Sequence, residues 1–149
     1  AKEVKEAAPR DVPVYLCHQT NCMGVMGSGI ALQIRKTYPE VYASYKDYCA
    51  QKGHWPDMLG SVQYVPCDDG VTVANLFGQY GYGRHKQQTN YEALEKAFTD
   101  IRDKGYSIVV IPYMIGCGLG GGDWAIVEKM ISDVFSGSQC EVCICKLPE

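Results

Sequence analysis

Two glycine-rich loops are the segments of this sequence whose residue types best suit a chemical role. The first covers residues 21–29 (NCMGVMGSG) and the second covers residues 116–122 (GCGLGGG). Glycine lets backbone N–H groups converge and approach an oxygen-rich ligand closely. A helix that begins directly after such a loop adds partial positive charge at its first turn. The loops therefore predict a site for a phosphate-containing ligand that needs no lysine or arginine.

The segments around the loops predict how they are held. Each loop follows a short β-branched and apolar segment that reads as a buried strand, and each precedes a segment with apolar residues at helical spacing. The predicted strands cover residues 12–18, 59–66, 71–77, 106–114 and 140–147, and the predicted helices cover 29–38, 39–53, 89–104 and 125–135. In such sheets, ligands bind beyond the carboxyl ends of the strands, on the loops that enter helices. Both glycine-rich loops are expected there.

Two common nucleotide-binding motifs do not fit the loops. Neither loop ends in the Gly-Lys-Ser/Thr of a Walker sequence, and neither combines Gly-x-Gly-x-x-Gly with a suitably spaced acidic residue. A P-loop and a dinucleotide-binding fold are therefore both poor interpretations.

Composition narrows the class of protein. The 149 residues suit one domain, and 46% hydrophobic with 21% charged residues is a globular composition. A formal net charge of −3 argues against a basic nucleic-acid surface and gives no indication of attraction to a membrane. No signal peptide or long apolar run is visible, so we expect a cytoplasmic protein. Residues 1–11 are expected to form an irregular arm or a short helix.

The eight cysteines predict buried thiols and no metal site. The only Cys-x-x-Cys pair is Cys140 with Cys143, and no second pair follows it. Cys143 and Cys145 are two residues apart, so on a strand they share a face. No cofactor is expected.

Four segments resemble the macrodomain family, and in particular its ADP-ribose-1″-phosphate phosphatases and terminal ADP-ribose hydrolases. They are residues 18–45, 74–83, 89–98 and 112–124, and the resemblance extends from about residue 14 to the C-terminus. It implies ADP-ribose as the ligand, with its diphosphate between the two loops. The ligand-binding residues that it implies are Asn21 near the distal ribose, with Met26, Gly27, Ser28, Gly29 and Ile30 on the first loop, and Gly116, Cys117, Gly118, Leu119 and Gly120 on the second. The acidic Gly-Asp-Ile-like turn that the family uses near adenine is missing.

Two residues are candidates for catalysis. His18, where similar phosphatases carry a histidine, could transfer a proton or could organise the first loop through hydrogen bonds. Asp123 could act as a general base on water or could cap the following helix. The resembled hydrolases use a lysine nucleophile and an acidic residue, whose positions fall near Tyr82 and Gly120 here, so that mechanism is disfavoured.

Other residues of the loops favour structural roles. Cys117 is expected to pack, although a helix N-terminus could lower its thiol pKa. His85 is expected in a solvated loop that could close over the ligand.

These observations predict a single three-layer α/β/α domain over residues 1–149, with a mixed central sheet. The expected function is hydrolysis at the distal ribose of an ADP-ribose derivative: removal of the 1″-phosphate or of an ester-linked group. The alternative is a reader that binds ADP-ribose or ADP-ribosylated macromolecules without turnover. Neither nucleic acid nor a membrane is expected as a partner.

Overall fold

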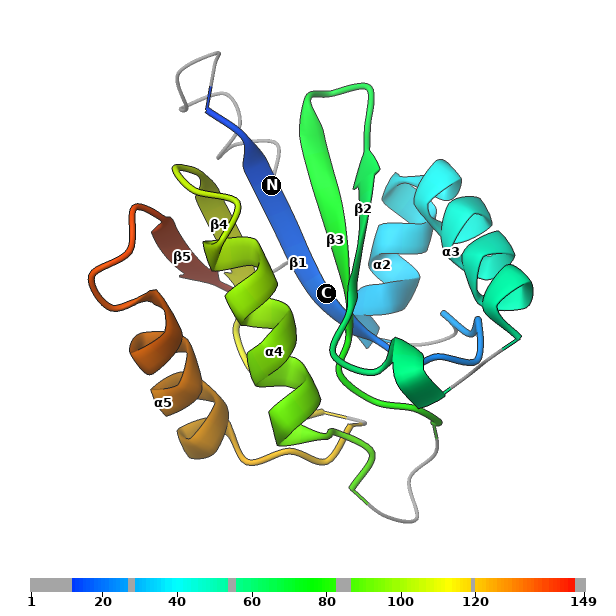
Figure 1. Cartoon of the computed structure of the whole chain (residues 1–149). Helices are drawn as coiled ribbons and strands as arrows, with labels where there is room; N and C mark the ends of the chain where they lie inside the picture. Colours follow the sequence, from blue (N-terminus) through cyan, green and yellow to red (C-terminus); the bar gives the residue numbers. More distant parts are fainter. Residues whose placement is uncertain (1–11, 27–28, 54–55, 83–86, 119, 147–149) are drawn as a thin grey trace.

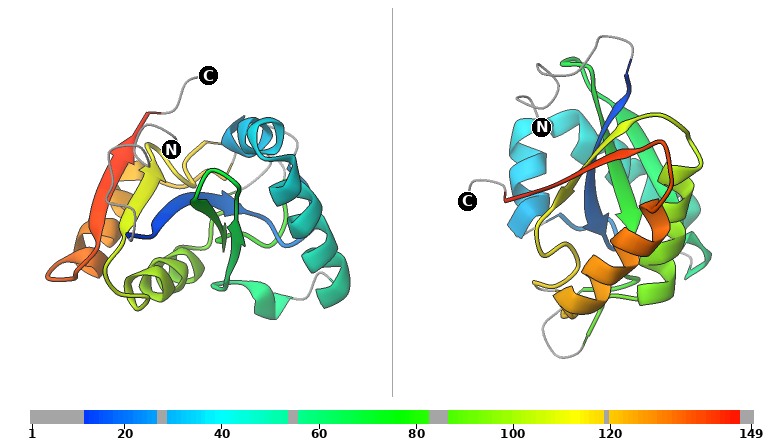
Figure 2. Two further views of the ribbon diagram at one scale, coloured as in Figure 1. Left: turned by 90° about the horizontal axis from the view of Figure 1, so that it is seen from above. Right: turned by 90° about the vertical axis from the view of Figure 1, so that its left-hand side faces the viewer.

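The computed structural model describes residues 12–26, 29–53, 56–82, 87–118 and 120–146, which form a five-stranded sheet with helices on both faces (Figures 1 and 2). The strands are β1 (Val14–Thr20), β2 (Val62–Pro66), β3 (Val71–Phe77), β4 (Ile108–Pro112) and β5 (Glu141–Cys145). The helices are α2 (Gly29–Thr37), α3 (Pro39–Lys52), α4 (Tyr91–Arg102) and α5 (Trp124–Phe135), with a short 3-10 helix η1 (Pro56–Met58). Residues 1–11, which the sequence predicts as an arm or a short helix, lie outside the described part.

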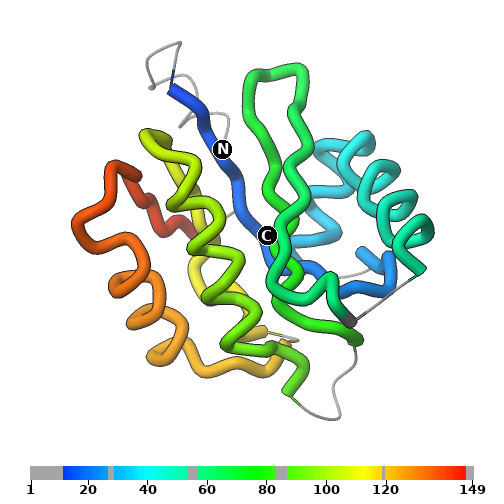
Figure 3. Tube along the Cα trace, viewed as in Figure 1, coloured from blue at the N-terminus to red at the C-terminus, as the bar shows by residue number. Residues whose placement is uncertain are grey.

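The sheet is mixed, as the sequence predicts. Its strand order is β2-β3-β1-β4-β5, and β1 lies between two parallel neighbours, with Val14 paired to Val71 of β3 and to Ile108 of β4. β5 continues the parallel arrangement beside β4. β2 is antiparallel to β3, and the two strands form the hairpin that the Cα trace shows in green (Figure 3). The parallel strands around β1 place the loops that follow them at one edge.

Each face of the sheet has its own apolar core. One core joins α2 and α3 to the sheet, and in it Tyr45 stacks on Phe77 with ring centroids 6.1 Å apart. The other joins α4 and α5 to the opposite face, where Phe98 meets Phe135 edge to face. These two cores confirm the predicted three-layer α/β/α architecture. Alternation along β1 decides which face each side chain takes, since Leu16 enters the first core and Cys17 the second.

The predicted helix boundaries follow local chemistry closely. Pro39 opens α3 at its first turn, and Gly53 ends it with a φ of 69° in the left-handed region. Asn90 caps α4 by accepting a hydrogen bond from the backbone N–H of Ala93 at 3.0 Å. The first strand differs from prediction, because it covers Val14–Thr20 rather than residues 12–18.

The cysteines are all free thiols, and the pair predicted to share a strand face does so, with the Sγ atoms of Cys143 and Cys145 2.9 Å apart. In the described part of the chain, no helix has both the length and the apolar character needed to cross a membrane.

Candidate ligand-binding site

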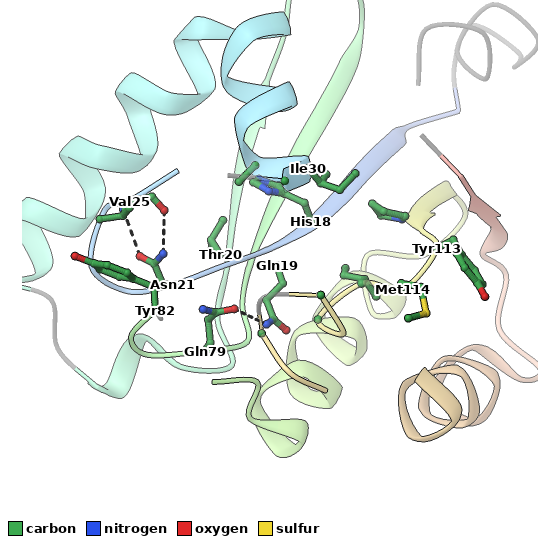
Figure 4. Close-up of a pocket in the computed structure, with 17 residues that line it drawn as sticks. His18, Gln19, Thr20, Asn21, Val25, Ile30, Gln79, Tyr82, Tyr113 and Met114 are labelled. Atoms are coloured by element: carbon green, nitrogen blue, oxygen red, sulfur yellow. Dashed lines mark hydrogen bonds between the residues drawn. The ribbon is translucent and has the colours of Figure 1, made fainter. Parts of the chain in front are cut away.

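A cavity of about 570 Å³ opens at the carboxyl edge of the sheet, between the two glycine-rich loops (Figure 4). Its volume suits a small-molecule ligand. The lining residues come from the end of β1, the first loop and the start of α2, from the segment after β3, and from the end of β4 with the second loop. They are His18, Gln19, Thr20, Asn21, Val25, Gly29, Ile30, Ala31, Gln79, Tyr82, Pro112, Tyr113, Met114, Ile115, Gly116, Gly118 and Gly120. Residues of both loops thus border one space.

The first loop is organised by the side chain of Asn21. Its Oδ1 accepts hydrogen bonds from the backbone N–H groups of Met23 and Val25, and its Nδ2 donates to the carbonyl of Val25 at 2.9 Å (Figure 4). The buried hydroxyl of Tyr45 lies 2.6 Å from the Asn21 carbonyl oxygen and 2.8 Å from its Oδ1. Asn21 lines the cavity, while much of its hydrogen-bonding capacity maintains the shape of the loop.

The second loop folds around one carbonyl. The oxygen of Gly116 accepts from the N–H of Gly122 at 2.9 Å and from the hydroxyl of Thr89 at 2.6 Å. The carbonyl of Gly120 accepts from the N–H groups of Gln88 and Thr89. Gln88 and Thr89, which precede α4, therefore hold the second loop in place. Sequence reasoning missed Thr89, because nothing local to it signals a contact with a loop 27 residues away.

Of the two helices that follow the glycine-rich loops, α2 and α5, only α2 begins in the cavity wall. α2 begins at Gly29 in the cavity wall and has no acidic residue in its first turn, so its partial positive charge is available to an anion. α5 is different, because the Asp123 carboxylate caps it by accepting from the N–H of Ala125 at 2.9 Å. Asp123 is exposed and does not line the cavity. The structure thus bears out the capping interpretation of Asp123.

His18 lies in the cavity wall at the end of β1, with only 2% of its surface exposed. Its Nε2 is 2.5 Å from Oδ1 of Asn75, and its Nδ1 is buried without a hydrogen-bond partner among the described residues. Burial lowers the pKa of His18 to about 4, and the hydrogen bond to Asn75 only partly opposes that shift. The imidazole is therefore neutral near pH 7.

Gln19 and Gln79 are further cavity residues that sequence reasoning missed. Nε2 of Gln19 donates to Oε1 of Gln79 at 2.7 Å and to the hydroxyl of Thr89 at 2.8 Å (Figure 4). This network ties the end of β1 to the second loop.

Met114 has an unusual backbone conformation, because it lines the cavity with a φ of 67°, which non-glycine residues rarely adopt.

The remaining predicted residues divide into three groups. Gly29, Ile30, Gly116, Gly118 and Gly120 line the cavity together with Asn21. Met26 is instead buried in the core, and Cys117 packs beside the second core with its Sγ 3.3 Å from the carbonyl of Ile115. Burial, and then the charge of Asp123, raise the pKa of Cys117, so the thiol is not activated. Gly27, Ser28, Leu119 and His85 lie outside the described residues.

The described cavity wall combines apolar side chains with uncharged polar groups, and it carries no carboxylate, ammonium or guanidinium group. Elsewhere in the described part of the chain, no cluster of three His, Cys, Asp or Glu side chains could hold a metal ion. The wall can therefore bind an anion through backbone amides, side-chain amides and the N-terminus of α2.

Comparison with known proteins agrees with this geometry. The family model of the Macro domain matches residues 17–131. A DNA ADP-ribosyl glycohydrolase of Mycobacterium tuberculosis is 30% identical over 122 residues, which are 80% of this chain and 34% of that protein. The chain thus spans about a third of the length of that relative.

Two further proteins match over most of their length. An ADP-ribose 1″-phosphate phosphatase of Saccharomyces cerevisiae is 26% identical over 158 residues, covering 87% of this chain and 88% of that protein. A macrodomain protein of Streptomyces coelicolor has a similar structure, with a TM-score of 0.76, 28% identity, and coverage of 97% of this chain and 95% of that one. Family model, sequence relatives and fold all agree, and this chain belongs to the macrodomain family.

Proposed function

We propose that this macrodomain binds ADP-ribose, with the diphosphate between the two glycine-rich loops. The observation that carries the proposal is that residues from both loops, about 90 positions apart in the sequence, line one cavity of about 570 Å³. The N-terminus of α2 and the backbone of the second loop supply hydrogen-bond donors and partial positive charge to that space. A net charge of −3 is compatible with this ligand, since local geometry rather than the overall field holds the anion.

The function that we favour is hydrolysis at the distal ribose, with ADP-ribose-1″-phosphate as the first substrate to test. In that reaction a water oxygen attacks the phosphorus, the bond between phosphorus and the ribose oxygen breaks, and the leaving oxygen takes a proton from solvent. His18 is the better placed of the two catalytic candidates, because it lines the cavity whereas Asp123 caps α5 outside it. A neutral imidazole can accept the proton of the attacking water.

A lysine-nucleophile mechanism has no support in the described residues. The positions that correspond to the lysine and the acidic residue of the resembled hydrolases fall near Tyr82 and Gly120, and both of these line the cavity. Neither a phenol nor a glycine can replace an amine or a carboxylate. We therefore propose hydrolysis by water rather than through a covalent intermediate on lysine.

The second candidate function is that of a reader, which binds free ADP-ribose or ADP-ribosylated macromolecules without turnover. The absence of any carboxylate from the described cavity wall favours this alternative, because many hydrolases use such a group as a base. Both functions require the same placement of the diphosphate.

Two measurements test the proposal. Calorimetric titration should show binding of ADP-ribose and much weaker binding of AMP and NAD; failure of ADP-ribose to bind would refute both candidate functions. Phosphate release from ADP-ribose-1″-phosphate should then occur and be lost in His18→Ala while ADP-ribose still binds. Binding without phosphate release in the unmodified protein would leave the reader as the correct function.

A further inference from the structure

Three polar residues form a row across strands β2, β3 and β1 of the sheet. Gln63 of β2 is in register with Asn75 of β3, which is in register with His18 of β1. Asn75 is completely buried and His18 nearly so. Only His18 of the three borders the cavity. Sheet register therefore connects a cavity residue to a residue two strands away.

The hydrogen bonds along this row have one direction, which a backbone carbonyl sets. Nε2 of Gln63 is 3.2 Å from the carbonyl oxygen of Ser44 in α3. Because a carbonyl oxygen can only accept, the NH₂ group of Gln63 must face Ser44 and its Oε1 must face the sheet. That Oε1 lies 3.0 Å from Nδ2 of Asn75, which donates to it.

The hydrogen bonds of Asn75 likewise determine which ring nitrogen of His18 carries the proton. With its NH₂ group used by Gln63, Asn75 presents Oδ1 to His18, and an amide oxygen can only accept. Nε2 of His18 must therefore carry the proton and donate it to Oδ1, across the 2.5 Å contact. Nδ1 is left with a bare lone pair, and it is the ring nitrogen that has no partner in the part of the chain that the structure describes.

We propose that Asn75 and Gln63 are positioning residues that hold His18 as the Nε2–H tautomer, so that Nδ1, which is buried in the ligand-free protein, is the ring nitrogen that accepts a hydrogen bond when an O–H group enters from the cavity. The O–H group is a ribose hydroxyl of the ligand or the attacking water. In this state His18 can accept a proton but cannot donate one to a leaving group. The functional part of this inference depends on the proposed function, whereas the tautomer itself does not.

The tautomer can be measured directly in the ligand-free protein. In chains labelled with 15N-histidine, a protonated ring nitrogen and a bare one have well separated chemical shifts. The chain has three histidines, so the His18 signals are those that disappear in His18→Gln. We expect one neutral tautomer with the proton on Nε2 at pH 7. A proton on Nδ1, or a charged ring, would overturn the proposal.

Substitutions at Gln63 test the relay without touching the cavity. Gln63→Leu removes the oxygen that orients Asn75, so the Asn75 amide can rotate and His18 should show both tautomers. Gln63→Glu keeps an acceptor for Nδ2 of Asn75 and should retain the single tautomer. Gln51→Leu is a matched control, because its amide bonds only Asp47 on the exposed side of α3 among the described residues. An unchanged spectrum in Gln63→Leu would exclude Gln63 from the relay.

Turnover provides a second readout. If the two tautomers of Gln63→Leu are about equally populated, kcat for phosphate release should fall by about half, in proportion to the competent fraction. KM and ADP-ribose affinity should change little, because Gln63 does not line the cavity. If the spectra behave as expected and no phosphate is released by the unmodified protein, the proposed function fails and the assignment of the tautomer stands. A large loss of ADP-ribose affinity in Gln63→Leu would indicate a merely structural role.

Discussion

The hydroxyl of Thr89 donates a hydrogen bond to the carbonyl oxygen of Gly116 at 2.6 Å, and this contact fixes the second glycine-rich loop to the segment before α4. Thr89 is buried and also accepts a hydrogen bond from Gln19. One side chain thus connects the end of β1, the start of α4 and the loop. The shape of the loop therefore depends on this residue as well as on its glycines.

Replacing Thr89 with valine should weaken both the fold and the site. The change keeps the branched shape but leaves Nε2 of Gln19 and the carbonyl of Gly116 each with one partner fewer, at a cost of about 1–3 kcal/mol in the free energy of unfolding. ADP-ribose affinity should fall as well, because the loop is less well held. Denaturant unfolding and calorimetry measure the two effects. Thr99→Val is the control, since that hydroxyl bonds a carbonyl on the exposed side of α4; equal losses in both variants would contradict the prediction.

Two glycines of the second loop should respond differently to alanine. A Cβ at Gly120 would lie 2.5 Å from the Thr89 hydroxyl and 2.8 Å from the Gly116 carbonyl oxygen, closer than such atoms can approach. A Cβ at Gly118 would meet no atom of the described residues within 4 Å. Gly120→Ala should therefore lower the melting temperature and the ADP-ribose affinity, while Gly118→Ala retains the melting temperature of the unmodified protein. A stable Gly120→Ala variant would show that the loop has another conformation.

The low pKa of His18 predicts how stability depends on pH. In the unfolded chain a histidine has its ordinary pKa of about 6.5, and burial lowers the pKa of folded His18 to about 4. Between these values the unfolded state binds the proton that the folded state excludes, so the stabilising effect is complete above about pH 6.5 and is lost as the pH falls toward 4. The loss amounts to as much as about 3 kcal/mol.

Urea unfolding from pH 7 to pH 4 measures this contribution. His18→Gln should lose less stability than the unmodified protein over that range, whatever its stability at pH 7. If the two proteins show parallel pH profiles, folded His18 does not have a depressed pKa.

Two substitutions at Asp123 distinguish its role as a helix cap from a role as a general base. Asparagine caps helices as well as aspartate does, so Asp123→Asn should retain stability, whereas Asp123→Ala should lose about 0.5–2 kcal/mol. Because the carboxylate does not line the cavity, phosphate release by Asp123→Asn should match the unmodified protein. A stable Asp123→Asn variant without turnover would instead restore the carboxylate as a general base.

Local sequence patterns were sufficient for the framework of this macrodomain. The alternation of apolar segments and helices predicts the three layers, and Pro39 and Gly53 mark the ends of α3 through their own backbone preferences. The sequence pattern predicts the first strand two residues early, because the polar Gln19 and Thr20 do not resemble buried strand residues. Their pairing with Leu76 and Phe77 of β3 extends the strand, and that pairing is not local.

The site was predictable only in part, for a related reason. Glycine content marks both loops, and the carboxyl-edge rule for parallel strands brings them together. Contacts between distant side chains leave no such mark: Asn75 lies 57 residues from His18, and Thr89 lies 70 residues from Gln19. In the sequence each of these residues is an ordinary polar residue, and only the fold shows which side chains it contacts.

The central position of β1 has a consequence for how the protein acquires its binding site during synthesis. β1 is the first strand of the described sheet in sequence, but its neighbours in the sheet are β3 and β4. During synthesis Val14 can therefore pair only after Val71, and later Ile108, have left the ribosome. Such pairings over long sequence separations slow folding, because the entropy of closing the chain is lost before the contacts form. A nascent chain that stops before β4 would have the first loop but no opposite wall. Affinity for a nucleotide should therefore arise late and abruptly in translation, rather than growing with chain length.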